Sequence, residues 1–169
     1  MEMARSLRQV EGSLGILCDR VSVQSARLDE LLFRAQRIAL SVKNGHKNPD
    51  MMFGSDLQHF RQEIRRFGFD VAAVPNRVGA IERAAEYDEA SVKAAQSLMR
   101  VCERLNRDVK ALHDKALLAH QHMREAEYKI EAWYLVQDIQ EMVQRAQSLP
   151  NIANRIVLRI SSPQGPQGG

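Results

Sequence analysis

Aromatic residues are scarce in this 169-residue chain, at 5% of the sequence. A globular core usually gains much of its buried area from Phe, Tyr and Trp, so 5% is thin for such a core. Hydrophobic residues still reach 44%, beside 27% charged residues, which excludes a disordered composition. Alanine, leucine, glutamine, arginine and glutamate fill the sequence instead, and these residues favour helix.

Cysteines are few, and long apolar runs are absent. The two cysteines, Cys18 and Cys102, lie far apart and form no CxxC motif or secretory framework, which favours a reducing compartment. The first residues have no apolar stretch typical of a signal peptide, and no window approaches the ~20 apolar residues that span a bilayer. We therefore expect a soluble intracellular protein. The formal net charge of +3 comes from interspersed charges, which favours solubility but does not mark a nucleic-acid binder.

The first stretch has the clearest helical pattern. Its apolar residues recur at alternating intervals of three and four, the a/d heptad of a coiled coil, for about five repeats. The repeat consists of Leu7, Val10, Leu14, Leu17, Val21, Leu28, Leu31, Ala35, Ile38 and Val42, with Gln24 as its one polar member. This predicts a coiled-coil helix over residues 1–43, whose apolar stripe needs a partner helix.

Glycine and proline divide the rest of the chain. Asn44-Gly45 and Pro49 predict a loop over 44–54, because neither continues a helix. A short helix is predicted over 55–68, ending at Gly68, followed by a linker over 69–74.

Pro75 suits the first turn of a third helix, predicted to be very long, over residues 75–149, with a corner near 86–91. Its apolar repeat consists of Ala95, Leu98, Cys102, Leu105, Val109, Leu112, Ala116, Ala119, Met123, Ala126, Ile130 and Trp133. Pro150 is predicted to end this helix and to leave a flexible tail over 150–169.

The expected fold is all-α: an extended coiled coil made of a long helix, a short helix and a very long helix. Helices of other coiled-coil subunits are expected to cover the apolar stripes. A hetero-oligomer is favoured over a homo-oligomer, and the seam residues leave the strand number open. The predicted partner-binding seam consists of Leu14, Leu17, Val21, Leu28, Leu31, Ile38, Val42, Leu57, Phe60, Ile64, Leu98, Leu105, Val109, Leu112, Met123, Ile130 and Trp133.

Motifs for catalysis and cofactor binding are missing. The sequence has no phosphate loop, dinucleotide fingerprint, GxSxG elbow or HExxH motif. His120 and His122 point to different faces of a helix, and no Cys or carboxylate completes a metal set with His113 and His120. We therefore expect no catalytic, cofactor-binding or metal site and no enzyme activity.

Two arginine clusters raise nucleic-acid binding as a minor alternative. One is Arg100, Arg104 and Arg107, and the other is Arg61, Arg65 and Arg66. Acidic residues are interleaved with both clusters, as on the solvated flank of a coiled coil, so nucleic-acid binding is not expected.

One stretch carries a family resemblance. Residues 27–45 follow the pattern RLxxLxxRxxRIxxxVKNG, and a short helix, Pro75, Arg77 and a last long helix come after it. This order resembles the C-terminal region of the fifty-four-kilodalton nucleoporin family over roughly residues 20–130. The chain departs from that family in having only two FG dipeptides, Phe53-Gly54 and Phe67-Gly68, neither of them in a repeat.

The resemblance implies a structural subunit of the nuclear pore central channel, acting in nucleocytoplasmic transport. Such a subunit would form a parallel heterotrimeric coiled coil with two other channel nucleoporins, anchored by an inner-ring adaptor at the nuclear envelope. The alternative is a coiled-coil scaffold of another assembly, such as a vesicle tether, a kinetochore or a secretion stalk, in a soluble cytoplasmic protein.

Overall fold

The computed structural model describes residues 2–163, and in this part of the chain all regular structure is helical. The prediction of an all-α protein is confirmed. The elements are α1 (Glu2–Lys43), α2 (Phe53–Ala84), the short 3-10 helix η1 (Glu89–Ser91), α3 (Val92–His122), α4 (Ala126–Gln147) and α5 (Leu149–Ser161).

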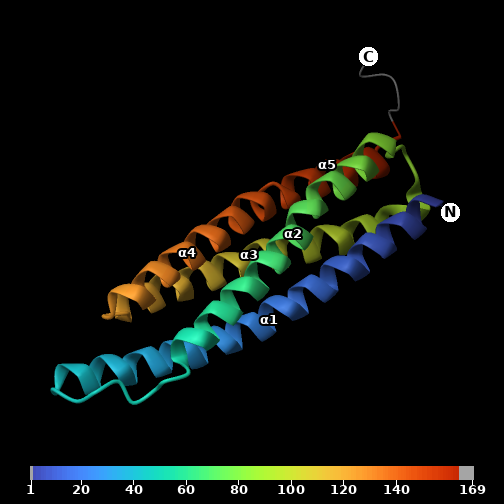
Figure 1. Cartoon of the computed structure of the whole chain (residues 1–169). Coiled ribbons are helices and arrows are strands. Elements are labelled where there is room, and N and C mark those ends of the chain that lie inside the picture. Colours follow the sequence, from blue (N-terminus) through green and yellow to red (C-terminus); the bar gives the residue numbers. More distant parts are fainter. Residues whose placement is uncertain (1, 164–169) are drawn as a thin grey trace.

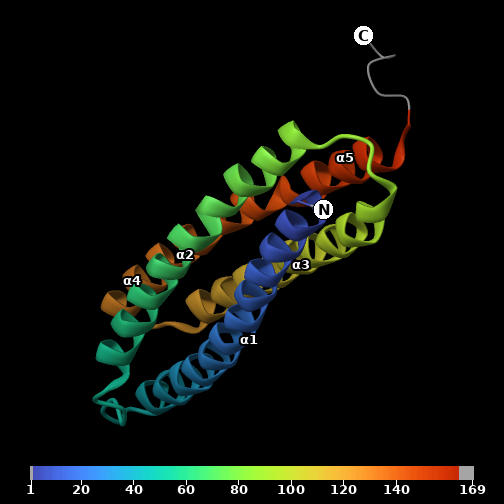
Figure 2. The same cartoon turned by 90° about the vertical axis from the view of Figure 1, so that its right-hand side faces the viewer.

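The helices form two antiparallel hairpins that lie side by side (Figures 1 and 2). α1 and α2 make one hairpin, and α3 with α4 and α5 makes the other. α1 lies parallel to α3, and α2 lies parallel to α4 and α5, so the segment 85–91 crosses one end of the bundle to join α2 to α3.

The predicted apolar stripes pack against one another within the chain. They form one continuous core, so the prediction that they need partner helices is corrected. The seam residues buried in this core are Leu14, Leu17, Val21, Leu28, Leu31, Ile38, Leu57, Phe60, Ile64, Leu98, Leu105, Val109, Leu112 and Met123. A loop and a crossing connection bring the stripes together. The stripes are therefore buried from solvent without the entropy cost of binding a second chain. Val42, Ile130 and Trp133 stay exposed.

α2 corrects the prediction of a short helix over 55–68 followed by a linker over 69–74. Gly68 and Pro75 both lie inside this helix. An interior proline costs about 3 kcal/mol, since it removes one hydrogen bond and crowds the preceding turn. The apolar repeat runs on past Gly68, and its burial offsets that cost; the residues concerned are Val71, Val74, Val78 and Ile81.

The predicted helix over 75–149 is in fact three segments. α2 ends at Ala84, and the connection 85–91 contains the predicted corner near 86–91. A second break, over 123–125, was not predicted; it lets α4 fold back antiparallel to α3.

The predicted tail over 150–169 is largely helical. Pro150 lies in the first turn of α5, where a missing backbone N–H costs nothing, so it begins a helix rather than leaving a flexible end. One face of α5 is buried, through Leu149, Ala153, Ile156 and Ile160. The part of this prediction over residues 164–169 lies outside the described residues.

Charged residues at heptad spacing set the register between α1 and α2. Arg20 pairs with Asp70 at 2.6 Å, Arg27 pairs with Glu63, and Arg34 pairs with Asp56 at 2.8 Å. Each step of seven residues forward on α1 is a step of seven backward on α2, as antiparallel helices require. A shift of one turn would break every pair.

A second line of α2 residues, also spaced by seven, faces α4 and α5. It holds Gly54 against Tyr128, Arg61 against Glu131, Gly68 against Met142, and Glu82 against Arg155. Pro75 lies on the same line, between Gly68 and Glu82. The two glycines let α2 approach α4 closely.

Two glycines test this packing. Gly15, in the middle of α1, has open space where a Cβ would sit, so Gly15→Ala should raise the free energy of unfolding by about 0.5–1 kcal/mol. A Cβ on Gly54 would lie 3.2 Å from Cε1 of Tyr128. Gly54→Ala should therefore raise the free energy of unfolding by less than Gly15→Ala does, or lower it. Urea unfolding of both variants measures the contrast, and equal gains would contradict the close approach of Gly54 to Tyr128.

Candidate interaction surface on α2 and α4

Metal ligands and thiols are the first candidates for a functional site. Residues 2–163 contain no group of three His, Cys, Asp or Glu side chains placed to hold a metal ion. Cys18 and Cys102 are both buried, and burial raises the pKa of each thiol, that of Cys102 to about 12. Both therefore stay protonated and unreactive near neutral pH. In the same part of the chain no helix is long and apolar enough to cross a membrane.

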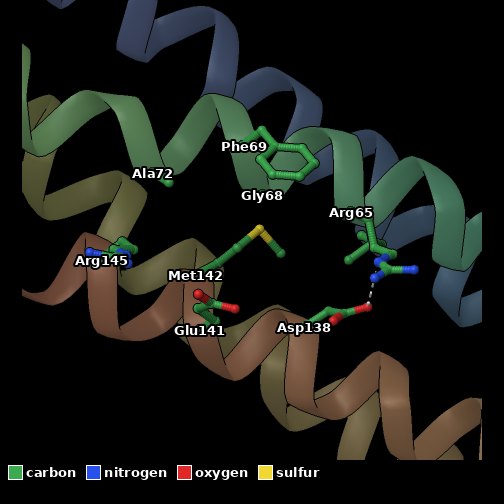
Figure 3. A pocket seen from close by; sticks show the side chains of 9 residues that line it. Arg65, Gly68, Phe69, Ala72, Asp138, Glu141, Met142 and Arg145 are labelled. Atoms are coloured by element: carbon green, nitrogen blue, oxygen red, sulfur yellow. Dashed lines mark ion pairs between the residues drawn. The ribbon is translucent and has the colours of Figure 1, made fainter.

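A groove of about 310 Å³ opens between α2 and α4 (Figure 3). Its floor is apolar, with the buried side chains of Ile64 and Met142, and its rim is charged. Gly68 keeps the space open, because a Cβ there would lie 3.6 Å from Cγ of Met142. The remaining lining residues are Arg65, Phe69, Ala72, Asp138, Glu141 and Arg145.

Asp138 is the best-enclosed charge on the rim. It lies 3.8 Å from Arg61 and 4.0 Å from Arg65, distances that make ion pairs without close hydrogen bonds. Arg61 instead donates to Glu131 at 2.9 Å. Burial raises the pKa of the Asp138 carboxyl, and the two arginines partly oppose that rise. Oδ2 of Asp138 is buried and accepts no hydrogen bond from the described residues.

Exposed aromatic side chains occur on both α2 and α4. Phe69, at the edge of the groove, is 76% exposed. Tyr134 and Trp133 on α4 are each 48% exposed, and the Trp133 ring centre lies 5.5 Å from that of His120 on α3. The guanidinium of Arg61 lies 4.7 Å from the ring centre of Tyr134. Aromatic residues, Met and Arg are enriched at the centres of protein interfaces. We name the groove together with Ile130, Trp133 and Tyr134 the α2–α4 surface.

Two residues of the predicted partner-binding seam, Ile130 and Trp133, are exposed on α4. Their role in binding stays a prediction. The third exposed seam residue, Val42, lies at the end of α1 instead. Phe69 was missed because the segment 69–74 was assigned to a linker; the apolar repeat that continues past Gly68 was the signal that could have placed it on a helix.

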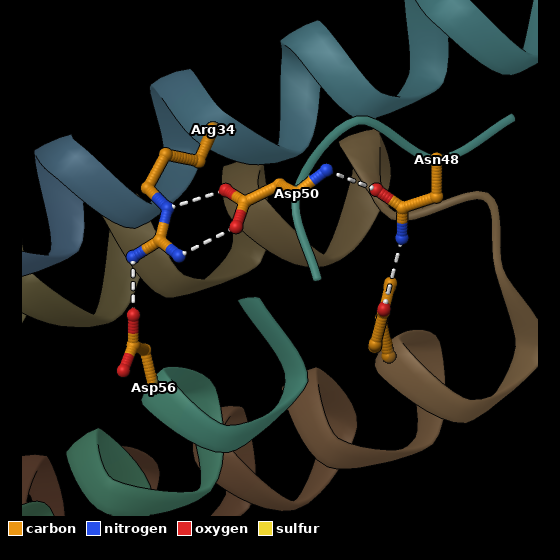
Figure 4. Close-up of polar contacts among 5 residues, drawn as sticks. Arg34, Asn48, Asp50 and Asp56 are labelled. Carbon is orange, nitrogen blue, oxygen red and sulfur yellow. Dashed lines mark hydrogen bonds and ion pairs between the residues drawn. The ribbon is translucent and has the colours of Figure 1, made fainter. Parts of the chain in front are cut away.

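Arg34 forms a partly enclosed polar cluster at the loop 44–52 (Figure 4). Its Nε and Nη2 donate to the two carboxylate oxygens of Asp50 at 2.6 and 2.9 Å, and its Nη1 donates to Asp56 at 2.8 Å. Asn48 donates from Nδ2 to the hydroxyl of Tyr128 at 3.1 Å. These bonds tie the loop to α1, α2 and α4, which is a structural role rather than a binding site.

Two arginines of the cluster on α3, Arg104 and Arg107, have acidic partners within the chain. Arg104 lies 3.4 Å from Asp108 and 3.8 Å from Asp19, and Arg107 lies 4.0 Å from Asp108. These side chains form an exposed mixed-charge surface, which gives phosphate no concentrated positive patch.

No protein-family model, no curated protein and no solved structure matches this chain. The nucleoporin resemblance therefore stays a prediction. Its pattern included a short helix, a proline and a last long helix, whereas Pro75 lies within the continuous helix α2.

Proposed function

We propose that this chain is a non-catalytic helical scaffold that binds a partner protein through the α2–α4 surface. The observation that supports the proposal is the groove above Met142, flanked by the exposed Phe69. An exposed apolar site with a polar rim is typical of a protein-binding surface.

The side chains that line the groove indicate which partner side chains it could bind. An apolar side chain of the partner would fill the space over Met142 and pack against Phe69. Asp138 and Glu141 would accept hydrogen bonds from basic groups, and Arg145 would bind a carboxylate. An amphipathic helix with an apolar anchor between charges of both signs meets these requirements.

This proposal retains the general function expected from the sequence, a structural subunit that assembles with other helical chains. A place in the nuclear pore, with roles in nucleocytoplasmic transport, is the more specific hypothesis, supported by the family resemblance over residues 20–130. The alternative is a scaffold of another assembly. Imaging of a tagged copy separates them, since the nucleoporin hypothesis expects a punctate nuclear rim.

Site-specific photo-crosslinking tests the α2–α4 surface. Replacing Phe69 with benzoylphenylalanine should crosslink a defined partner in the native cell, while the same replacement at Leu158, which is 58% exposed on α5, should not. Gly68→Leu should abolish the Phe69 crosslink, because the new side chain fills the groove.

The matched control is Ala73→Leu, which adds the same side chain at an exposed position of α2 that does not line the groove. It should leave the crosslink intact, with unchanged helix content by circular dichroism. Equal crosslinking from both positions, or crosslinking that persists in Gly68→Leu, would rule out the groove as the binding site.

A further inference from the structure

α1 carries a second apolar stripe on its outer face. Ile16, Val23, Phe33 and Leu40 are 63%, 53%, 60% and 61% exposed, on a helix whose opposite face forms the core. They lie on one face because their spacings are those of a heptad repeat, and the exposed Ala26 falls on the same line. No described residue of the chain covers this outer stripe, although four large apolar residues recur along it.

Three charged residues complete the outer stripe at the same spacing: Asp19, Glu30 and Arg37. The side chain of Asp19 is 79% exposed, although it lies 3.8 Å from Arg104. The order of apolar, negative and positive positions along the stripe is its most informative feature, because it determines what can dock against it.

The order is complementary to its own reverse. When a second α1 lies antiparallel, with the pair centred near Leu28, Ile16 faces Leu40 and Val23 faces Phe33. Asp19 then faces Arg37, and Ala26 faces Glu30. A two-fold axis makes each of these contacts twice, as in an isologous dimer.

Other alignments are less favourable. A shift of one heptad sets Asp19 opposite Glu30, and a parallel, in-register pair sets every charged residue opposite its own copy. Like charges facing each other across a helix pair are unfavourable. A shift the other way sets Phe33 opposite Glu30 and leaves Ile16 without an apolar partner. Charge and apolar contact together therefore favour the antiparallel alignment centred near Leu28.

We propose that the outer stripe of α1 is a dimerisation surface and that its occupant is a second copy of this chain in antiparallel orientation. The flanking arginines Arg20, Arg27 and Arg34 do not oppose this contact, since each is paired with an acidic residue of α2. The α2–α4 surface lies on other helices, so the dimer would display two such surfaces at once.

Charge exchange tests the alignment directly. In sedimentation equilibrium of the full chain over a concentration series, the wild type should form a dimer. Asp19→Arg alone and Arg37→Asp alone should each raise the dissociation constant about tenfold, because each change turns two attractive pairs into repulsive ones. The double variant should restore the wild-type constant, and an equimolar mixture of the two single variants should form a heterodimer.

The double variant also separates the contact between copies from the contact within one copy. Like Asp19→Arg, it loses the attraction between position 19 and Arg104, so a restored dissociation constant can come only from the contact with position 37 of the second copy. Val23→Glu should give a monomer, while Leu158→Glu, a matched change at an exposed leucine of α5, should remain a dimer. Circular dichroism checks that every variant folds. A monomeric wild type, a dimer insensitive to Val23→Glu, or a double variant without rescue would each overturn the proposal, while leaving the Phe69 crosslink unaffected.

Discussion

Leu105→Ala should lower the free energy of unfolding by about 2–5 kcal/mol. Leu105 lies in α3 and is fully buried in the core formed by the two hairpins. Truncation removes apolar atoms from a packed interior and leaves a cavity that rigid neighbouring helices cannot fully close. The loss is large because the apolar stripe of α3 is buried against helices of the same chain.

The measurement is urea unfolding in the Val23→Glu background, which the dimer proposal makes monomeric. The control is Leu118→Ala, on the same helix but 43% exposed, which should cost less than about 1 kcal/mol. The loss in Leu105→Ala should not change with protein concentration, because no second chain covers this stripe. A loss that appears only as weakened association would show that the stripe binds partner helices, as the sequence pattern suggested.

Arg34→Leu should lower the free energy of unfolding by about 1–3 kcal/mol at pH 7, because it leaves two carboxylates without their donor. The Arg34 side chain is 19% exposed and that of Asp50 is 24% exposed, so solvent screens this cluster less than the other pairs along α1. The matched control is Arg27→Leu, whose pair with Glu63 is 51% and 39% exposed and should contribute less than about 1 kcal/mol.

The loss of stability in Arg34→Leu should depend on pH, because the pKa of Asp50 is lowered in the folded protein. The side-chain hydrogen bond from Arg34 lowers the pKa of Asp50, while partial burial opposes that effect. A carboxyl whose pKa is lower in the folded state stabilises the fold above its unfolded pKa, and this contribution fades as pH falls through the folded pKa. The difference between wild type and Arg34→Leu should therefore shrink below about pH 4. A difference that stays constant from pH 7 to pH 3 would exclude the ion pair as its cause.

The sequence pattern predicted the bounds of α1 closely. Its helix was predicted over 1–43 and spans Glu2–Lys43, because an uninterrupted heptad repeat is followed by Asn44-Gly45 and Gly45 takes a positive φ of 82°. The candidate surface was found less completely. Ile130 and Trp133 stood out as seam residues, whereas Phe69 depended on recognising that α2 continues beyond Gly68.

Helicity and the positions of the apolar stripes follow from residue order, because both are local properties of the chain with a period near 3.6 residues. The residues that cover each stripe are a matter of packing between segments far apart in the sequence. Burial of Val71 and Val74 outweighs the local signals of Gly68 and Pro75, and the Arg34–Asp50 bond helps to hold the loop that joins α1 to α2. On α1 both faces carry a heptad repeat, and the folding of the two hairpins buries one stripe and leaves the stripe with Ile16 and Phe33 in solvent.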